Sequence, residues 1–357
     1  MIIHNEAFNM SNNQRFLYEV VPIRLFLIVM LVFYHAFAIF TGAWKPISGY
    51  PEIPSYTLLG NLSYACLLET FVFISGYVFG YQVRVKGDVA LSAKKLFVKK
   101  FKRLIVPSII FSIAYLLIIE GFHDSMFSTL YQLLCGVAHM WFLPMLFWCF
   151  VIVWMLEKVK LKHNIALLLL LTLSIISFIP LPLRLGVALY YAVFFYVGYL
   201  IQRDYRTDKE LPKATIAMGI IGFISFFILK GFLSDSDNIQ LFGIDLLDKA
   251  LRLSLSSFVR LSCASFGIYI IYSVSKMLVN DSNLVNGGGR EKIIALSENC
   301  FGVYLFQQFV LKLIYNSSIP QILNPFLLPL ISFAAALIVS LLLTIVIRNT
   351  TIGKSLL

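Results

Sequence analysis

The chain has 357 residues, of which 59% are hydrophobic and 13% are charged, and its formal net charge at pH 7 is +11. Soluble domains carry about 25% charged residues, so a water-soluble fold of this length could not bury so much apolar surface, whereas a bilayer solvates it. The basic residues lie in short loops between apolar runs, which excludes the continuous basic face of a nucleic-acid-binding protein, and we expect no nucleic-acid partner.

Ten apolar runs are long enough and poor enough in charge to cross a bilayer as helices. They occupy residues 20–40, 61–82, 104–121, 138–157, 164–180, 187–202, 214–232, 254–278, 293–315 and 326–347. The fifth and sixth runs are short and only the turn-like IPLPLRLG separates them, so they could be tilted or partly re-entrant, and nine or eleven spans stay open. We predict an all-α polytopic membrane bundle of about ten transmembrane helices, with residues 1–357 forming one domain.

The distribution of Lys and Arg predicts that both termini lie in the cytoplasm, because cytoplasmic loops carry the excess of positive charge. In this orientation Arg15 and most other basic residues lie inside. The basic residues placed outside are Lys45, Arg184, Lys230, Lys249, Arg252 and Lys312. Arg24 and Arg260 fall within predicted spans. The bias also favours an even number of spans.

Residues 84–103, with the sequence RVKGDVALSAKKLFVKKFKR, form the most basic loop. Its apolar residues Leu91, Leu96, Phe97 and Phe101 would share one side of a helix. An amphipathic basic helix of this kind is typical of a segment lying on the inner membrane surface, where anionic lipid attracts it. Membrane lipid is therefore an expected partner.

The cysteines lie mostly inside apolar runs and show no CxxC spacing. They are Cys66, Cys135, Cys149, Cys263 and Cys300. This pattern is typical of small buried apolar residues rather than a disulfide framework or a zinc site, and we expect no metal.

The first predicted helix contains two ionisable residues, Arg24 and His35. Ionisable side chains inside a membrane are costly and mark functional sites. Eleven residues make about three helical turns, so both side chains would lie on nearly the same face, roughly 16 Å apart along the axis. The alternatives are an Arg24 that extends to the interface and a His35 that makes an ordinary interhelical hydrogen bond.

Three further polar residues match His35 in predicted depth. Glu69 is the one acid in the second span, and Gln307 and Gln308 lie in the ninth. A carboxylate beside His35 would orient the imidazole and select its tautomer. We predict that Glu69 and His35 are partners in a polar chamber; if the side chains face different neighbours, each makes only a local hydrogen bond.

Arg24 and His35, an Arg followed by ten residues and a His, resemble the signature of the acyltransferase-3 family of membrane O-acyltransferases. Further segments resemble this family in the same order along the chain. They are ETFVFISGYVFG from Glu69, KKFKRLIVPSIIFS, HMWFLPMLF from His139 and FFYVGYLI from Phe194. FGVYLFQQFVL departs from the pattern, because many members have a His where Gln307 and Gln308 lie here. The resemblance extends from about Arg15 to Lys354.

This resemblance implies transfer of an acyl group, usually acetyl, from cytoplasmic acetyl-CoA or another acyl-CoA to a hydroxyl of a glycan or lipid-linked saccharide. It implies a catalytic set of His35 as general base with Glu69 and Arg24. CoA is polyanionic, so basic side chains at the inner face are the predicted donor-binding groups. They are Arg24, Lys99, Lys100, Lys102 and Arg103. Whether an acyl-enzyme forms stays open, with Ser75 as the nucleophile to test.

The predicted acceptor-binding residues are Ser75, His139, Trp141, Arg260, Gln307 and Gln308. Structural alternatives compete for several of them. Ser75 could allow close helix packing, Trp141 and His139 could anchor the outer interface, and Arg260 could be an interface residue. The basic run at 94–103 could bind lipid instead of CoA.

Two other functions remain open: a proton-coupled transporter or flippase for a glycan or organic ion, and a non-catalytic subunit of a polysaccharide synthesis complex. A transporter usually shows repeat symmetry, which the sequence lacks. By analogy with the family, we expect a multi-pass protein of a bacterial inner membrane. The acceptor, the choice between acetyl and succinyl donors, and a homo-oligomeric state stay open.

Overall fold

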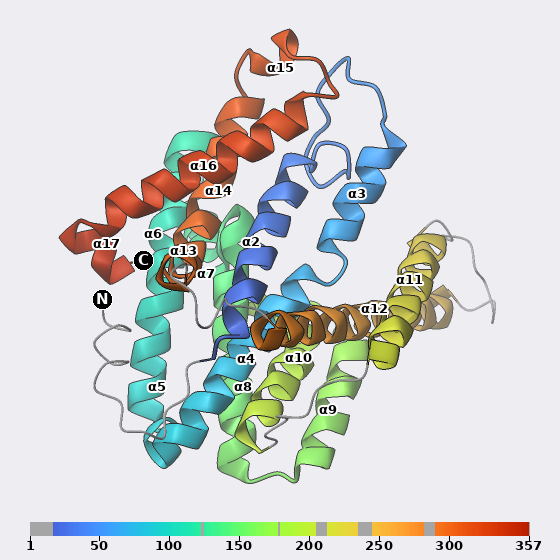
Figure 1. Ribbon diagram of the computed structural model, residues 1–357, viewed down its shortest axis with the longest axis vertical. Coiled ribbons are helices and arrows are strands. Elements are labelled where there is room, and N and C mark those ends of the chain that lie inside the picture. The colour runs from blue at the N-terminus through green and yellow to red at the C-terminus, as the bar shows by residue number, and fades with distance from the viewer. Residues whose placement is uncertain are drawn as a thin grey trace.

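The computed structural model describes residues 17–122, 125–177, 179–204, 213–234, 245–281 and 290–356, and these residues form helices and turns without any strand. Arg15 and the other residues before Leu17, used above for the orientation, lie outside the described residues. The predicted all-α fold is confirmed (Figure 1).

The helices follow one another with short connections. In chain order they are α2 (Val20–Ala36), α3 (Pro54–Tyr64), α4 (Leu67–Lys86), η1 (Gly87–Val89), α5 (Ala93–Lys100), η2 (Phe101–Ile105), α6 (Val106–Tyr115), η3 (Leu116–Glu120), α7 (Met126–Cys135), η4 (Ala138–Trp141), α8 (Phe142–Val159), α9 (His163–Ile175), η5 (Pro182–Arg184), α10 (Leu185–Arg203), α11 (Lys213–Ser234), α12 (Asp245–Asp281), α13 (Arg290–Glu298), α14 (Cys300–Tyr315), α15 (Ile319–Ile322), α16 (Leu328–Arg348) and α17 (Thr351–Leu356).

Within the described residues, seven helical segments are long and apolar enough to cross a membrane, judged by length and composition. They are Pro54–Lys86, Ala93–Glu120, Ala138–Val159, Pro182–Arg203, Ala214–Leu233, Leu247–Val279 and Leu328–Arg348. The other three predicted runs form the shorter apolar helices α2, α9 and α14. Every predicted run is therefore helical, while the number of about ten spans and the side on which the termini lie remain predictions.

Helices α4 and α10 approach each other to backbone contact. A Cβ atom added to Gly76 or Gly80 of α4 would overlap the carbonyl group of Phe195 or Tyr199 on α10. Gly198 of α10 meets α4 in the same way. Small residues let transmembrane helices approach to backbone contact, where dispersion forces hold them. The glycines of the SGYVFG and VGY segments therefore fix the position of one helix pair.

Helix α2 lies in the middle of the molecule, in contact with α3, α14 and α16 (Figure 1). Arg24 lies near its first turn and His35 near its last. Both ends of this helix face α14: the Cys300 Sγ at the start of α14 donates to the Arg24 carbonyl oxygen, and Gln307 farther along α14 contacts His35. The Arg24 backbone and the His35 side chain therefore both contact α14, and the shared face of the two side chains stays a prediction.

The basic segment 84–103 is not a separate surface helix. Helix α5 continues through the π-helical turn η2 into α6, so that Ala93–Glu120 is one helical run. Phe97 packs edge-on against Trp154, whose indole Nε1 donates to the Leu91 carbonyl oxygen at 2.9 Å. The apolar side of the segment thus packs on α8 rather than facing lipid alone, because aromatic side chains of α8 are available to cover it.

Candidate active site

Four polar side chains form a histidine–amide network in the middle of the bundle: His35, His139, Gln307 and Gln308. His35 Nδ1 lies 3.1 Å from Gln307 Oε1, and Gln308 Nε2 donates to His35 Nε2 at 2.9 Å. The other end of the Gln308 amide, Oε1, accepts from His139 Nδ1 at 2.9 Å. All four residues are buried. One amide therefore bridges two histidines that come from α2 and η4, segments far apart in the sequence.

These contacts select the tautomer of His35. An amide nitrogen only donates and an amide oxygen only accepts. His35 therefore carries its proton on Nδ1, facing Gln307 Oε1, and presents a lone pair on Nε2 to Gln308. A neutral imidazole with an unprotonated Nε2 is the form that can take up a proton.

His139 faces two acceptors at once. Its Nδ1 meets Gln308 Oε1 and its Nε2 lies 3.2 Å from the Leu305 carbonyl oxygen, so only a doubly protonated ring satisfies both. Reversing the Gln308 amide gives the complementary arrangement. Neutral His139 then donates from Nε2 to Leu305, and Gln308 Oε1 accepts from a protonated His35 Nε2. In each arrangement one histidine is doubly protonated and the other is neutral, and the direction of the Gln308 amide decides which one carries the extra proton.

An aromatic cap covers His35. The Trp44 ring is parallel to the imidazole, with ring centroids 6.0 Å apart. The Lys312 ammonium lies 4.1 Å from the centroid of the Trp44 ring. The Tyr315 hydroxyl donates to the Ala36 carbonyl oxygen and its ring packs edge-on against Trp44. A lysine over an indole face is a cation–π contact that holds the ring in place. Trp44 and Lys312 were not identified from the sequence, where a Trp and a Lys near helix ends indicate only interfacial anchors.

Glu69 lies in a second polar cluster and does not pair with His35, so the predicted partnership is wrong. The Tyr190 hydroxyl donates to Glu69 Oε1 at 3.1 Å, and the Arg260 guanidinium lies 4.6 Å from the centroid of the Tyr190 ring. Between the two clusters, Tyr34 stacks on Tyr64 with ring centroids 4.0 Å apart. Depth along a helix does not specify the direction in which a side chain points, and these aromatic rings occupy the intervening space.

The predicted donor-binding residues divide into three kinds. Arg24 and Arg103 are close enough to interact electrostatically. Lys99 and Lys102 are exposed. The Lys100 ammonium instead lies 3.7 Å from the centroid of the Phe150 ring, a cation–π contact on α8, and Lys100 is only partly exposed.

Three predicted acceptor-binding residues lie outside the histidine–amide network. The Ser75 hydroxyl donates to the Phe71 carbonyl oxygen at 2.8 Å, within its own helix, and its neighbour Gly76 makes the α4–α10 contact. Trp141 packs near Tyr191, with ring centroids 6.4 Å apart. Arg260 belongs to the Glu69 cluster. Only His139, Gln307 and Gln308 of the predicted acceptor set are brought to His35.

Two further residues of this site were also missed. Tyr304 donates from its hydroxyl to the His139 carbonyl oxygen at 2.6 Å, and its ring packs edge-on against the His139 imidazole. Tyr115 is fully buried beside His139, and its hydroxyl has no hydrogen-bond partner among the described residues. Tyrosines in apolar helices are common, so sequence alone gives no signal that these two support a histidine.

A family model described as an acyltransferase domain matches residues 23–348, which is most of the chain. The match begins just before Arg24 and ends at Arg348, the last residue of α16. No curated protein and no solved structure matches the chain.

Proposed function

The chain belongs to the acyltransferase-3 family of membrane acyltransferases, and on this basis we propose that it transfers an acetyl group from cytoplasmic acetyl-CoA to a hydroxyl of a glycan or lipid-linked saccharide in a bacterial inner membrane. One observation carries the proposal within the bundle. The side chain of the buried residue His35 is held by two amides in the tautomer whose Nε2 is unprotonated and carries a lone pair.

The reaction is a direct transfer with His35 as general base. The acceptor hydroxyl takes the place of the Gln308 amide at His35 Nε2 and gives its proton to that nitrogen. Its oxygen attacks the thioester carbonyl carbon, the new ester bond forms, and the carbon–sulfur bond breaks. The CoA thiolate then receives the proton from His35, so that ester and CoA are the products and the base is restored.

Gln307 supports this proton transfer. When His35 becomes an imidazolium, Gln307 Oε1 still accepts from its Nδ1. Hydrogen-bond acceptors aimed at the charge that forms in the transition state are worth more in a buried site than in water.

The donor approaches from the opposite end of α2. Arg24 and Arg103 interact electrostatically at this end, and in this proposal they pair with CoA phosphates. The distance from Arg24 to His35, roughly 16 Å along the axis, suits the extended pantetheine arm of CoA, which brings the thioester to His35. A serine nucleophile is not needed, because the Ser75 hydroxyl is already bonded within α4.

The test measures CoA release from acetyl-CoA by purified protein with and without acceptor glycans. His35→Ala should lower acyl transfer by about 10²- to 10⁴-fold, as is typical of a lost general base, while leaving acetyl-CoA binding intact. His163→Ala is the matched control. His163 is the first residue of α9, hydrogen-bonds to the Tyr196 hydroxyl and is not part of the network. A His35→Ala protein with near-normal turnover would refute the mechanism, and an unaltered protein that transfers no acyl group would favour a proton-coupled transporter.

A further inference from the structure

A cavity of about 540 Å³ opens at the end of the bundle opposite the basic segment. It lies among η3, α7, η4 and the connection from α9 to α10. Glu120 ends the helical run that begins at Ala93, so the cavity is about 30 Å from the basic segment along that run. Its volume is in the range of small-molecule sites, roughly 300–1,000 Å³.

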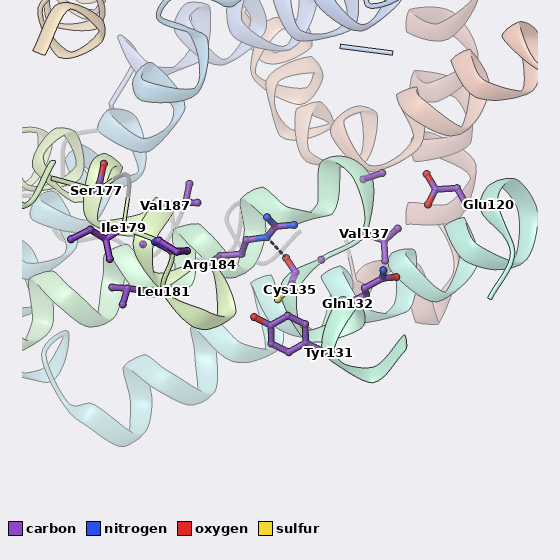
Figure 2. A pocket seen from close by; sticks show the side chains of 14 residues that line it. Glu120, Tyr131, Gln132, Cys135, Val137, Ser177, Ile179, Leu181, Arg184 and Val187 are labelled. Atoms are coloured by element: carbon purple, nitrogen blue, oxygen red, sulfur yellow. Dashed lines mark hydrogen bonds between the residues drawn. The ribbon is translucent and has the colours of Figure 1, made fainter. Parts of the chain in front are cut away.

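Three kinds of surface follow one another across the cavity (Figure 2). One end is apolar and exposed, with Ile179 and Leu181. Arg184 lies in the middle, near Tyr131. Glu120 lies at the other end. Hydrocarbon, an anion and hydroxyl groups are the respective ligand parts that such surfaces bind.

Arg184 is held in a strained position that leaves much of its guanidinium available. Its Nε donates to the Cys135 carbonyl oxygen at 3.1 Å, and its other nitrogens have no hydrogen-bond partner among the described residues (Figure 2). Leu183 and Arg184 both have positive φ, 53° and 64°. The Trp148 indole donates to the Leu183 carbonyl oxygen at 2.8 Å and fixes this turn. Left-handed backbone at residues other than glycine is costly and concentrates at ligand sites.

The cavity wall adjoins the loop that leads into the candidate active site. Val137 and Ala138 line the cavity, and the next residue is His139 of the histidine–amide network. Ala138 is also left-handed, with φ of 47°, and a Cβ atom at Gly136 would meet the backbone of Met140. The polar end of the cavity therefore lies beside the loop that carries His139, with adjacent Cα atoms about 3.8 Å apart.

We propose that this cavity binds the acyl acceptor as a lipid-linked saccharide phosphate, with its hydrocarbon chain at Ile179 and Leu181, its phosphate on Arg184 and its sugar toward Glu120 and His139. The inference rests on the proposed acyl transfer and specifies the acceptor class. An acceptor that diffuses in the membrane reaches the exposed apolar end first, and the Arg184 guanidinium then offers a fork of donors to phosphate oxygens.

The test is equilibrium binding of farnesyl phosphoglucose to purified protein in nanodiscs. Glucose 1-phosphate lacks the lipid and farnesyl phosphate lacks the sugar, so both should bind at least about tenfold more weakly. Arg184→Gln should raise the Kd for farnesyl phosphoglucose about tenfold or more, whereas Arg252→Gln, on α12 and outside the cavity lining, should not. Arg184→Lys should restore only part of the loss, because a lysine lacks the planar fork.

A second variant keeps the proposal testable if Arg184→Gln does not fold. Leu181→Gln should weaken farnesyl phosphoglucose but leave glucose 1-phosphate unchanged. The proposal is overturned if phosphatidylglycerol competes as well as the phosphosugar, which makes the cavity a phospholipid site, or if no variant changes the Kd.

Measuring ligand binding and acetyl transfer on the same proteins distinguishes a failure of the cavity assignment from a failure of the proposed function. Binding that depends on Arg184 without any acetyl transfer would refute the proposed function alone. Acetyl transfer to free sugars, unaffected by Arg184→Gln, would refute the cavity assignment alone.

Discussion

Replacing Gln308 tests whether the bridging amide controls the protonation of His35. In Gln308→Glu, the carboxylate has the same shape but only accepts hydrogen bonds. Both histidine nitrogens that face it, His35 Nε2 and His139 Nδ1, would then have to donate. His35 would lose the lone pair on which base catalysis depends. In Gln308→Leu the lone pair stays, and only the orientation of the ring is lost.

The expected magnitudes follow from the two contacts of 2.9 Å that Gln308 makes with His35 and His139. A hydrogen bond to a charged group contributes about 1.5–3 kcal/mol, so the carboxylate should lower kcat roughly 10- to 150-fold by holding His35 as an imidazolium. A neutral hydrogen bond contributes about 1 kcal/mol, so Gln308→Leu should lower kcat only about fivefold. The charged, isosteric variant is therefore expected to be the slower one.

The assay is acetyl transfer at saturating donor and acceptor, with the ¹⁵N NMR signals of His35 recorded on the same proteins. Gln308→Glu should show two protonated ring nitrogens and Gln308→Leu one. The donor KM should be the same in both variants, because Gln308 does not contact the donor-binding cations. If Gln308→Glu turns over as fast as Gln308→Leu, the amide does not control the base and the reasoning fails.

Other predictions concern the donor end, the helix contact and the second cluster. Arg103→Ala should raise the KM for acetyl-CoA about tenfold, since a charge-assisted phosphate contact contributes about 1.5–3 kcal/mol; an unchanged KM at constant salt would indicate lipid binding instead. Gly76→Ala should lower the thermal unfolding midpoint, because the added Cβ meets the Phe195 carbonyl and overpacking costs about 1–3 kcal/mol. Ser75→Ala should leave acetyl transfer unchanged, and a loss of activity in a folded Ser75→Ala protein would make Ser75 a nucleophile. Glu69→Gln should leave the tautomer of His35 unchanged in ¹⁵N NMR spectra, and a change would restore the direct partnership.

The helices could be predicted from the sequence because apolar length is a strong signal in a membrane protein. Each predicted run is helical. The arrangement around α2 was also partly accessible, since Gln307 and Gln308 match His35 in depth and do contact it.

The partners of Glu69 and Lys100 could not be predicted, because they depend on the rotation of each helix about its axis. Glu69 faces Tyr190 on α10, a helix that glycine contacts bring against α4. Lys100 appears in the sequence as one of several basic residues, yet it alone lies over the Phe150 ring. Composition and depth are one-dimensional, whereas these contacts follow from three-dimensional packing.

The two amides on His35 also bear on the side reaction with water. Acyl-CoA is a reactive thioester, and a free base beside it would promote its hydrolysis. In the structure both ring nitrogens of His35 are occupied, and Trp44 lies parallel to the ring. A lone water molecule has little apolar surface with which to move Trp44, whereas a sugar can stack on it. The resting arrangement should therefore conserve the donor until the acceptor arrives.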